Sequence, residues 1–286
     1  MEHEVEQPVT GGSDRATDPD FLASVRRATV RPGEISLWYT GGAGYVIRTA
    51  AATLLIDPFV GPSNPPDWIR AIPPAFDAAE IGDLGGLDAI LLTHEHGDHA
   101  DPDALGPLGR LTEAQVLGPT ACVDVALRAG VPAERAQVLS HDESATFGDL
   151  RVTAVPMNDP GAPGCNGYVL ETGAVAILHC GDSLYFPGFL DLGRRWSFDA
   201  ICLSVGANPP GRNFYLDEAG AARAARDAGA RLLIAQHYDL WQGITLDPQR
   251  VAIAAAWYCP EAQVVPAKVQ QRITVGAASA SGSDFR

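Results

Sequence analysis

A run of metal-ligating side chains, THEHGDH at 93–99, directly follows a short apolar segment. Three imidazoles and a carboxylate so close together cannot all belong to a core, because buried polar groups need partners. On a turn that leaves a strand, His94 and His96 can reach one ion, whereas Asp98 and His99 can reach a second. This donor set suits Zn, Mn or Fe, since Ca and Mg prefer oxygen ligands alone. The run predicts a metal site; the alternative is a surface histidine cluster with incidental metal affinity.

The elements that must position this run follow from the hydropathy pattern. Strands are expected at 35–39, 45–48, 53–56, 88–92, 150–155, 168–171, 175–179, 200–203 and 231–235. Helices are expected at 21–29, 120–129 and 216–228, and a Gly follows each of the last two. Because strands and helices interleave, we expect an α/β fold in which helices cover sheets.

The length of 286 residues allows one large domain or two of ordinary size, and 46% apolar residues indicate a globular core. No break in composition divides the chain. We therefore expect a single domain over 20–275, between flexible tails at 1–19 and 276–286.

The charge balance limits the classes of partner. Thirty-five acidic and twenty basic residues give a net charge of −15, and no basic run could bind nucleic acid or an anionic membrane. The N-terminus does not resemble a signal peptide, and the apolar stretch at 251–259 is too short to span a bilayer. Five dispersed cysteines favour reduced thiols. These features predict a cytoplasmic protein with a small-molecule substrate and leave a homo-oligomer open.

The H-E-H-G-D-H run resembles the H-x-H-x-D-H signature of the metallo-β-lactamase superfamily. The resemblance implies an αββα sandwich with further ligands downstream. It assigns Asp182, which follows the segment AILHCG, as a carboxylate that bridges two metals, and His237, at a strand end, as another ligand. Where the superfamily has a histidine in P-x-x-H, this chain has Asp159. We also assign Asp98 and His99 to catalysis.

Within the superfamily, the chain is similar to the L-ascorbate-6-phosphate lactonases, which also carry an aspartate at the position of Asp159. The similarity rests on HCGDSLYF, SVGANPPG, AQHYDLWQ and VLGPTACVDVALRAGVPAER, and extends over residues 28–260. This chain lacks the insertion after the aspartate and the C-terminal extension of those lactonases. Recognition of a phosphate group therefore does not follow from the resemblance.

The resemblance predicts a metal-dependent hydrolase that opens a lactone or related cyclic ester of a small polar molecule. One or two divalent ions, Mn or Zn first and Fe as an alternative, would provide a metal-bound hydroxide and stabilise the oxyanion. The carboxylate of Asp159 favours a harder ion than Zn. The alternatives are a di-iron, oxygen-using member of the superfamily, a phosphodiesterase or nuclease, and a non-catalytic relative.

Residues outside the ligand set are candidates for supporting roles. Asp57 is either a hydrogen-bond acceptor for a ligand histidine or a turn aspartate before Pro58. Arg212 is expected to hold an anionic substrate group, which with the metals predicts a polar, neutral to cationic pocket. The other candidates for substrate contact are Asn208, Ser183, Tyr185, Tyr238 and Trp241. His179 is expected to be a core histidine with satisfied nitrogens.

Overall fold

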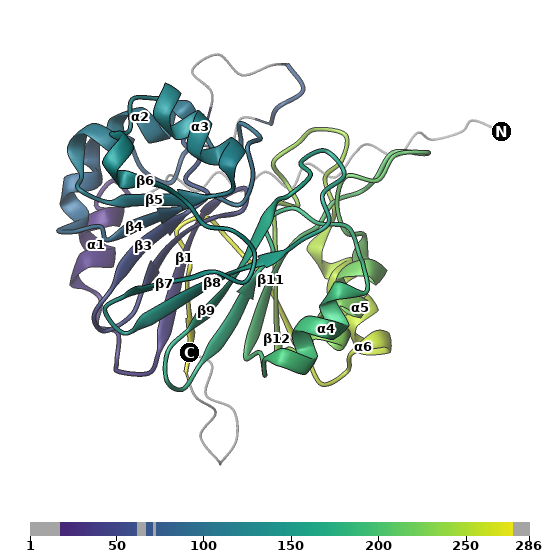
Figure 1. Cartoon of the computed structure of the whole chain (residues 1–286). Coiled ribbons are helices and arrows are strands. Elements are labelled where there is room, and N and C mark those ends of the chain that lie inside the picture. Colours follow the sequence, from purple (N-terminus) through teal and green to yellow (C-terminus); the bar gives the residue numbers. More distant parts are fainter. Residues whose placement is uncertain (1–17, 62–66, 71–72, 277–286) are drawn as a thin grey trace.

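Two seven-stranded sheets pack face to face in the computed structural model, which describes residues 18–61, 67–70 and 73–276 (Figure 1). The first sheet consists, in spatial order, of β14 (Arg272–Val275), β1 (Ile35–Gly41), β2 (Gly44–Arg48), β3 (Thr53–Ile56), β4 (Ala89–Leu91), β5 (Gln115–Gly118) and β6 (Ala136–Val138). The second consists of β13 (Gln263–Pro266), β12 (Leu232–Gln236), β11 (Ala200–Ser204), β10 (Ala176–His179), β9 (Asn166–Glu171), β8 (Leu150–Pro156) and β7 (Ser144–Phe147).

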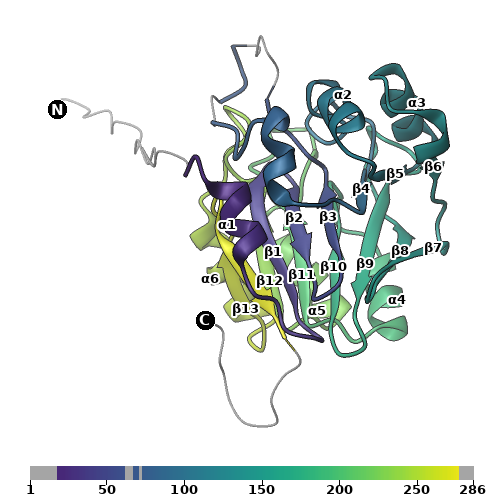
Figure 2. The same ribbon diagram turned by 90° about the vertical axis from the view of Figure 1, so that its left-hand side faces the viewer.

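Helices cover the outer face of each sheet (Figures 1 and 2). Those on the first sheet are α1 (Phe21–Arg27), the 3₁₀ helix η1 (Ala78–Leu84), α2 (Pro102–Leu111) and α3 (Thr120–Arg128). Those on the second are α4 (Gly188–Arg195), α5 (Glu218–Ala228) and α6 (Pro248–Tyr258), and the short 3₁₀ helix η2 (Ala133–Arg135) precedes β6. The αββα sandwich predicted from the sequence is confirmed. Of the predicted tails, all but residues 18, 19 and 276 lie outside the described residues.

Both sheets have the same order of strand pairings. From β14 to β6, three antiparallel pairings are followed by three parallel ones. The second sheet repeats this order from β7 to β13. Each sheet therefore has a group of parallel strands whose carboxyl ends share one edge.

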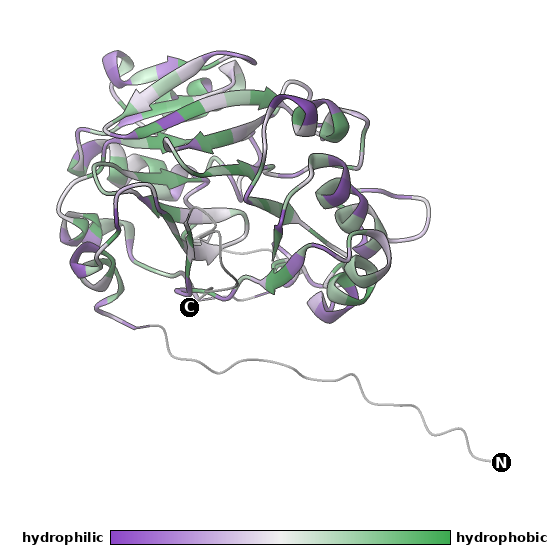
Figure 3. Cartoon of the chain, turned by 90° about the horizontal axis from the view of Figure 1, so that it is seen from below, coloured by the Kyte–Doolittle hydropathy of each residue, from purple (hydrophilic) through white to green (hydrophobic). Residues whose placement is uncertain are grey.

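Alternate side chains of the strands build three apolar layers. Leu54 and Ile56 of β3 lie between the sheets, whereas Leu55 faces the helices of the first sheet. In β12, Ile234 lies between the sheets and Leu233 packs beneath α5 and α6. Figure 3 shows the apolar residues concentrated in the strands and the hydrophilic residues on the outer helix faces. Because both faces of each sheet are covered, its central strands are continuous apolar runs.

The predicted strands are found within a few residues of their expected bounds, and α3 and α5 match the two Ala-rich predictions. Sequence analysis missed α2, α4, α6 and the short strands β5, β6, β7, β13 and β14. A start signal was present for α6, since Asp247 caps Gln249 N and Pro248 follows at the first turn. The first residues of α4 offer no such signal, because no side chain caps that helix.

The described residues bear on two expectations, the absence of a membrane-spanning segment and the presence of reduced thiols. No helix among them is long and apolar enough to cross a membrane. All five cysteines are buried and unpaired.

Candidate metal centre

The predicted ligands lie on four loops at one end of the sandwich. The 93–99 loop follows β4, Asp159 follows β8, Asp182 follows β10, and His237 directly follows β12. β8 and β10 run in the same direction because each pairs antiparallel with β9, and β10 and β12 are both parallel to β11. The carboxyl ends of these three strands therefore share one edge of the second sheet.

Buried hydrogen bonds join this edge to the first sheet. The amide of Asn166 donates to the carbonyl oxygen of Thr93 over 2.8 Å, at the start of the ligand loop. The amide of His237 donates to the Tyr39 hydroxyl over 3.2 Å. These contacts fix the loops of the two sheets relative to each other.

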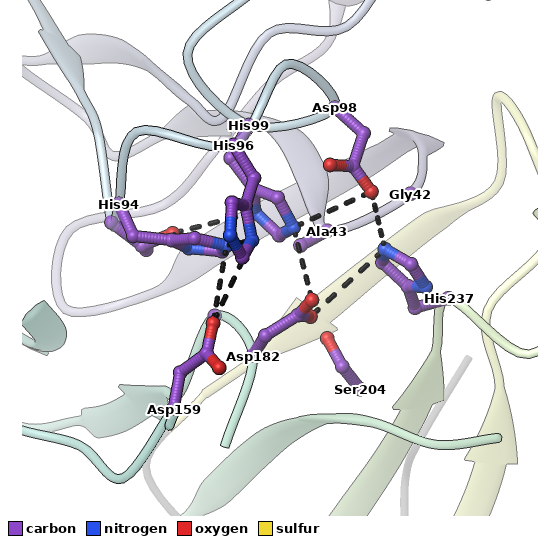
Figure 4. Close-up of polar contacts among 12 residues, drawn as sticks. Gly42, Ala43, His94, His96, Asp98, His99, Asp159, Asp182, Ser204 and His237 are labelled. Carbon is purple, nitrogen blue, oxygen red and sulfur yellow. Dashed lines mark hydrogen bonds and ion pairs between the residues drawn. The ribbon is translucent and has the colours of Figure 1, made fainter. Parts of the chain in front are cut away.

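The first group of donors joins His94, His96 and Asp159 (Figure 4). His94 Nε2 lies 2.9 Å from His96 Nδ1, and Asp159 Oδ2 lies 3.6 and 3.7 Å from these two nitrogens. Their ligand atoms lie within 4.8 Å of one another. Burial lowers the pKa of His94 to about 3, so its imidazole is neutral and has a free lone pair.

The second group joins Asp98, His99 and His237. His237 Nε2 and His99 Nε2 lie 3.2 and 3.8 Å from Asp98 Oδ2. Asp182 lies between the groups: its Oδ2 is 3.3 Å from His99 Nε2, and it forms a third set of donors with His94 and His99 (Figure 4). The structure therefore brings together all seven predicted ligands.

Unpaired buried atoms show that these residues fit metal ions. His99 Nε2 and Asp182 Oδ1 are buried without a hydrogen-bond partner, which is costly unless a cation contacts them. Burial alone would raise the pKa of Asp98 and Asp182, but the imidazoles of His99 and His237 lower both pKa values, so both carboxylates stay ionised. The carboxylates in turn raise the pKa of His99 and His237, so in the absence of a cation these imidazoles hold protons that a metal ion would replace. Imidazole and carboxylate ligands together form a donor set for one or two ions of the Zn, Mn and Fe type.

Asp57 orients one of these histidines, the first of its two predicted roles. Its Oδ2 accepts a hydrogen bond from His99 Nδ1 over 2.8 Å and another from Thr93 Oγ1 over 2.6 Å. Its Oδ1 accepts from the Thr93 amide over 2.8 Å. A proton held on Nδ1 leaves the Nε2 lone pair of His99 facing the donor group. Sequence analysis did not identify the part played by Thr93.

The backbone at this edge is held in a conformation that most residues avoid. Gly181, which precedes Asp182, has φ 55°, and a Cβ there would lie 2.8 Å from the Thr93 side chain. His237 also has a positive φ, 66°. Left-handed backbone at a non-glycine residue stores strain that the surrounding structure must offset, and such strain is common at functional sites.

A pocket of about 670 Å³ opens beside the donor groups. One side is formed by His96, Gly97 and Asp98 of the ligand loop. The other lining residues are mainly aromatic and aliphatic: Phe59, Trp68, Ile69, Phe214, Tyr215, Trp241, Gln242 and Ile244. Of the two predicted catalytic residues, Asp98 lines the pocket and His99 is fully buried behind it.

The mainly apolar lining differs from the polar, neutral to cationic pocket that the sequence predicted. Of the predicted substrate contacts, Trp241 lines it, whereas Arg212 is exposed and is not among its lining residues. Asn208 holds the wall from behind, because its Oδ1 accepts the amides of Phe214 and Tyr215 over 2.7 and 3.1 Å. Sequence analysis did not predict the other aromatic lining residues, which are Phe59, Trp68, Phe214 and Tyr215.

The other predicted contacts lie outside the pocket lining. Tyr185 is exposed and donates to Asp227, Ser183 is buried and donates to the carbonyl of Leu184, and Tyr238 donates to the carbonyl of Ala267. Their role in substrate binding stays a prediction. His179 is the core histidine expected, since its Nε2 donates to the Ala43 carbonyl and its Nδ1 accepts from the Gly181 amide.

The fold and the donor groups define a protein of the metallo-β-lactamase class. The family model described as "Beta-lactamase superfamily domain" matches residues 52–238, more than half of the chain. The chain therefore belongs to this superfamily of metal-dependent hydrolases.

The chain is also similar to individual curated proteins and solved structures. Proteins named "Probable L-ascorbate-6-phosphate lactonase UlaG", from Escherichia coli O139:H28 and Escherichia fergusonii, are 24% identical over 80% of this chain and 76% of theirs. Among solved structures, isothiocyanate hydrolase from Delia radicum gut bacteria has a TM-score of 0.68 at 15% identity and covers 85% of this chain and 100% of its own. CmlA, a diiron beta-hydroxylase from Streptomyces venezuelae, has a TM-score of 0.63 at 17% identity, with coverages of 86% and 55%. These two structures are similar to the chain in fold.

Proposed function

We propose that this protein is a metal-dependent hydrolase that opens a lactone or a related cyclic ester. The observation that carries the proposal is that His96 and Asp98, one from each donor group, line the same pocket. A substrate held there would meet both groups at once. The similarity to L-ascorbate-6-phosphate lactonases over 80% of the chain supports an ester ring as the bond that is cleaved.

The residues fall into two ligand sets. One ion would be held by His94, His96 and Asp159 and the other by Asp98, His99 and His237, with Asp182 facing both. Divalent ions bound there supply Lewis acidity and lower the pKa of a bound water toward neutrality. Asp57 keeps His99 in the tautomer that such a site needs.

Ring opening by water requires no nucleophilic side chain. The oxygen of water bonds to the carbonyl carbon, and the bond from that carbon to the ring oxygen breaks. One proton of the water passes to the ring oxygen, and the other is released from the new carboxyl group to solvent, which gives a hydroxycarboxylate. The pocket residues would hold the ring against His96 and Asp98.

The test combines metal content with a substrate screen. Protein loaded separately with Mn, Zn or Fe should open one or more lactones from a panel that also contains phosphate esters, and Asp98→Ala should lose this activity. Asp191→Ala, which changes an exposed aspartate of α4, is the matched control and should remain active. A fully loaded protein that opens no lactone would contradict the proposal.

The position of Asp159 also favours a second candidate, an iron-dependent oxygenase. A carboxylate in the first donor group is a harder ligand than histidine, and CmlA, whose fold is similar, is a diiron hydroxylase. Substrate-dependent oxygen consumption by the Fe-loaded protein would support this candidate. The nuclease alternative gains no support, because the described pocket lining contains no Lys or Arg.

A further inference from the structure

A stacked pair of tryptophans forms one wall of the pocket. The rings of Trp68 and Trp241 lie 4.7 Å apart at an interplanar angle of 27°. Their backbones are joined, because Ile69 and Trp241 form an isolated β-bridge and the Gln242 amide donates to the Trp68 carbonyl over 3.1 Å. The pair is therefore held by main-chain contacts from two distant segments.

The apolar wall continues to the donor groups. The centroid of the Tyr215 ring lies 4.8 Å from that of the His237 ring. Phe214, the preceding residue in the chain, also lines the pocket. Trp68 and Phe214 are 58% and 43% exposed, which is unusual for large apolar side chains around a concave site. A ligand that covers them gains the free energy of removing this surface from water.

The lining offers little to a phosphate group. Its acidic and basic side chains are His96 and Asp98, which belong to the donor groups. Phosphate sites in proteins use Arg, Lys or helix N-termini, and Arg212, the predicted anion contact, lies outside the lining. A phosphorylated sugar would thus lose its hydration here without gaining a cationic side-chain partner.

We propose that the pocket binds an aromatic or branched alkyl group carried by the ring that is opened. This inference rests on the proposed function and names its substrate class as aryl- or alkyl-substituted lactones. The pocket volume of about 670 Å³ lies within the usual range for small-molecule sites. Each methylene added to the buried substituent should raise kcat/KM about fourfold until the pocket is filled.

Binding to the metal-free protein tests the pocket independently of hydrolysis. In calorimetric titrations, γ-phenyl-γ-butyrolactone should bind at least about tenfold more tightly than γ-butyrolactone. Trp68→Ala should remove most of this difference, and Trp241→Phe, which keeps an aromatic ring in the wall, should preserve it. Trp257→Ala is the matched control, because Trp257 is 83% exposed on α6 and does not line the pocket. Circular dichroism spectra should show that all variants are folded.

The second part of the test measures lactone hydrolysis by the metal-loaded protein. A rise in kcat/KM from γ-butyrolactone to its phenyl derivative, reduced in Trp68→Ala and unchanged in Trp257→Ala, supports the inference. Hydrolysis of both lactones at equal kcat/KM, with equal binding, overturns it and leaves the proposed function intact. Selective binding of the phenyl derivative without hydrolysis of any lactone in the panel overturns the ring-opening substrate class. It also contradicts the proposed function.

Discussion

The two sheets share one order of strand pairings but contribute to the metal centre in different ways. The first sheet supplies four donors from a single loop, 93–99, after β4. The second supplies one donor from each of three loops, Asp159, Asp182 and His237. The same architecture thus concentrates ligands in one half and distributes them in the other. Only the concentrated half is visible as a motif in the sequence.

A closer comparison concerns two aspartates in equivalent places. Asp57 follows β3 and Asp182 follows β10, and each of these strands is the fourth from the edge where antiparallel pairing begins. All the hydrogen bonds that the Asp57 carboxylate accepts come from Thr93 and His99. Asp182 Oδ1 has no hydrogen-bond partner and lies 3.9 Å from His237 Nε2. The carboxylate satisfied by protein donors orients a ligand, and the carboxylate with an unpaired oxygen can contact a cation.

The largest expected effect comes from removing the aspartate that faces both donor groups. Asp182→Ala should lower kcat/KM by about a thousandfold and reduce the content of both ions. This loss exceeds the effect of about 10–100-fold expected when a residue that hydrogen-bonds to a metal ligand is removed. Asp159→Ala, which removes a residue of one group, should reduce the content of one ion only. Elemental analysis of both variants measures this difference. Full metal content in Asp182→Ala would show that the second sheet contributes no shared ligand.

This asymmetry explains which features the sequence could predict. The H-x-H-x-D-H run gave four of the seven ligands directly. The resemblance to the superfamily gave the other three, Asp159, Asp182 and His237, because each follows an apolar run that forms a strand. The pocket walls could not be predicted in this way. Trp68 and Trp241 meet through a bridge between segments about 170 residues apart, and no local pattern encodes that pairing. Short strands such as β6 and β13 were missed because three or four residues carry too little periodicity.

The next largest effect is expected from the residues that hold His99 of the 93–99 loop in place. Asp57→Asn should weaken metal affinity by about 10–100-fold, because the amide no longer holds the His99 proton as a carboxylate does. Thr93→Val removes one of the hydrogen bonds to Asp57 but keeps the shape of the side chain, and it should have a smaller effect in the same direction. Competition with a chelator measures both affinities. An affinity unchanged in both variants would mean that His99 needs no such support.

A smaller change is expected where the second sheet departs from the histidine of the superfamily pattern. Asp159→His should shift metal preference toward Zn by about tenfold relative to Mn, because imidazole is a softer ligand than carboxylate. Competitive loading with equal Zn and Mn, followed by elemental analysis, measures the ratio. An unchanged ratio would indicate that Asp159 only caps its turn, where Oδ1 accepts the Gly161 amide over 2.8 Å.

The smallest expected effect concerns Arg212, which lies on the loop after β11 in the second sheet. The sequence predicted a contact with an anionic substrate group, but the side chain is exposed and does not line the pocket. Arg212→Ala should therefore change KM by less than about twofold, as expected for a solvated charge that is screened by salt. Steady-state kinetics on a neutral lactone and a carboxylated lactone measure this. A KM that rises about tenfold for the carboxylated lactone alone would show that Arg212 moves into the site when substrate binds. The second sheet would then supply a cationic contact as well as ligands, and the apolar lining would describe only part of the substrate.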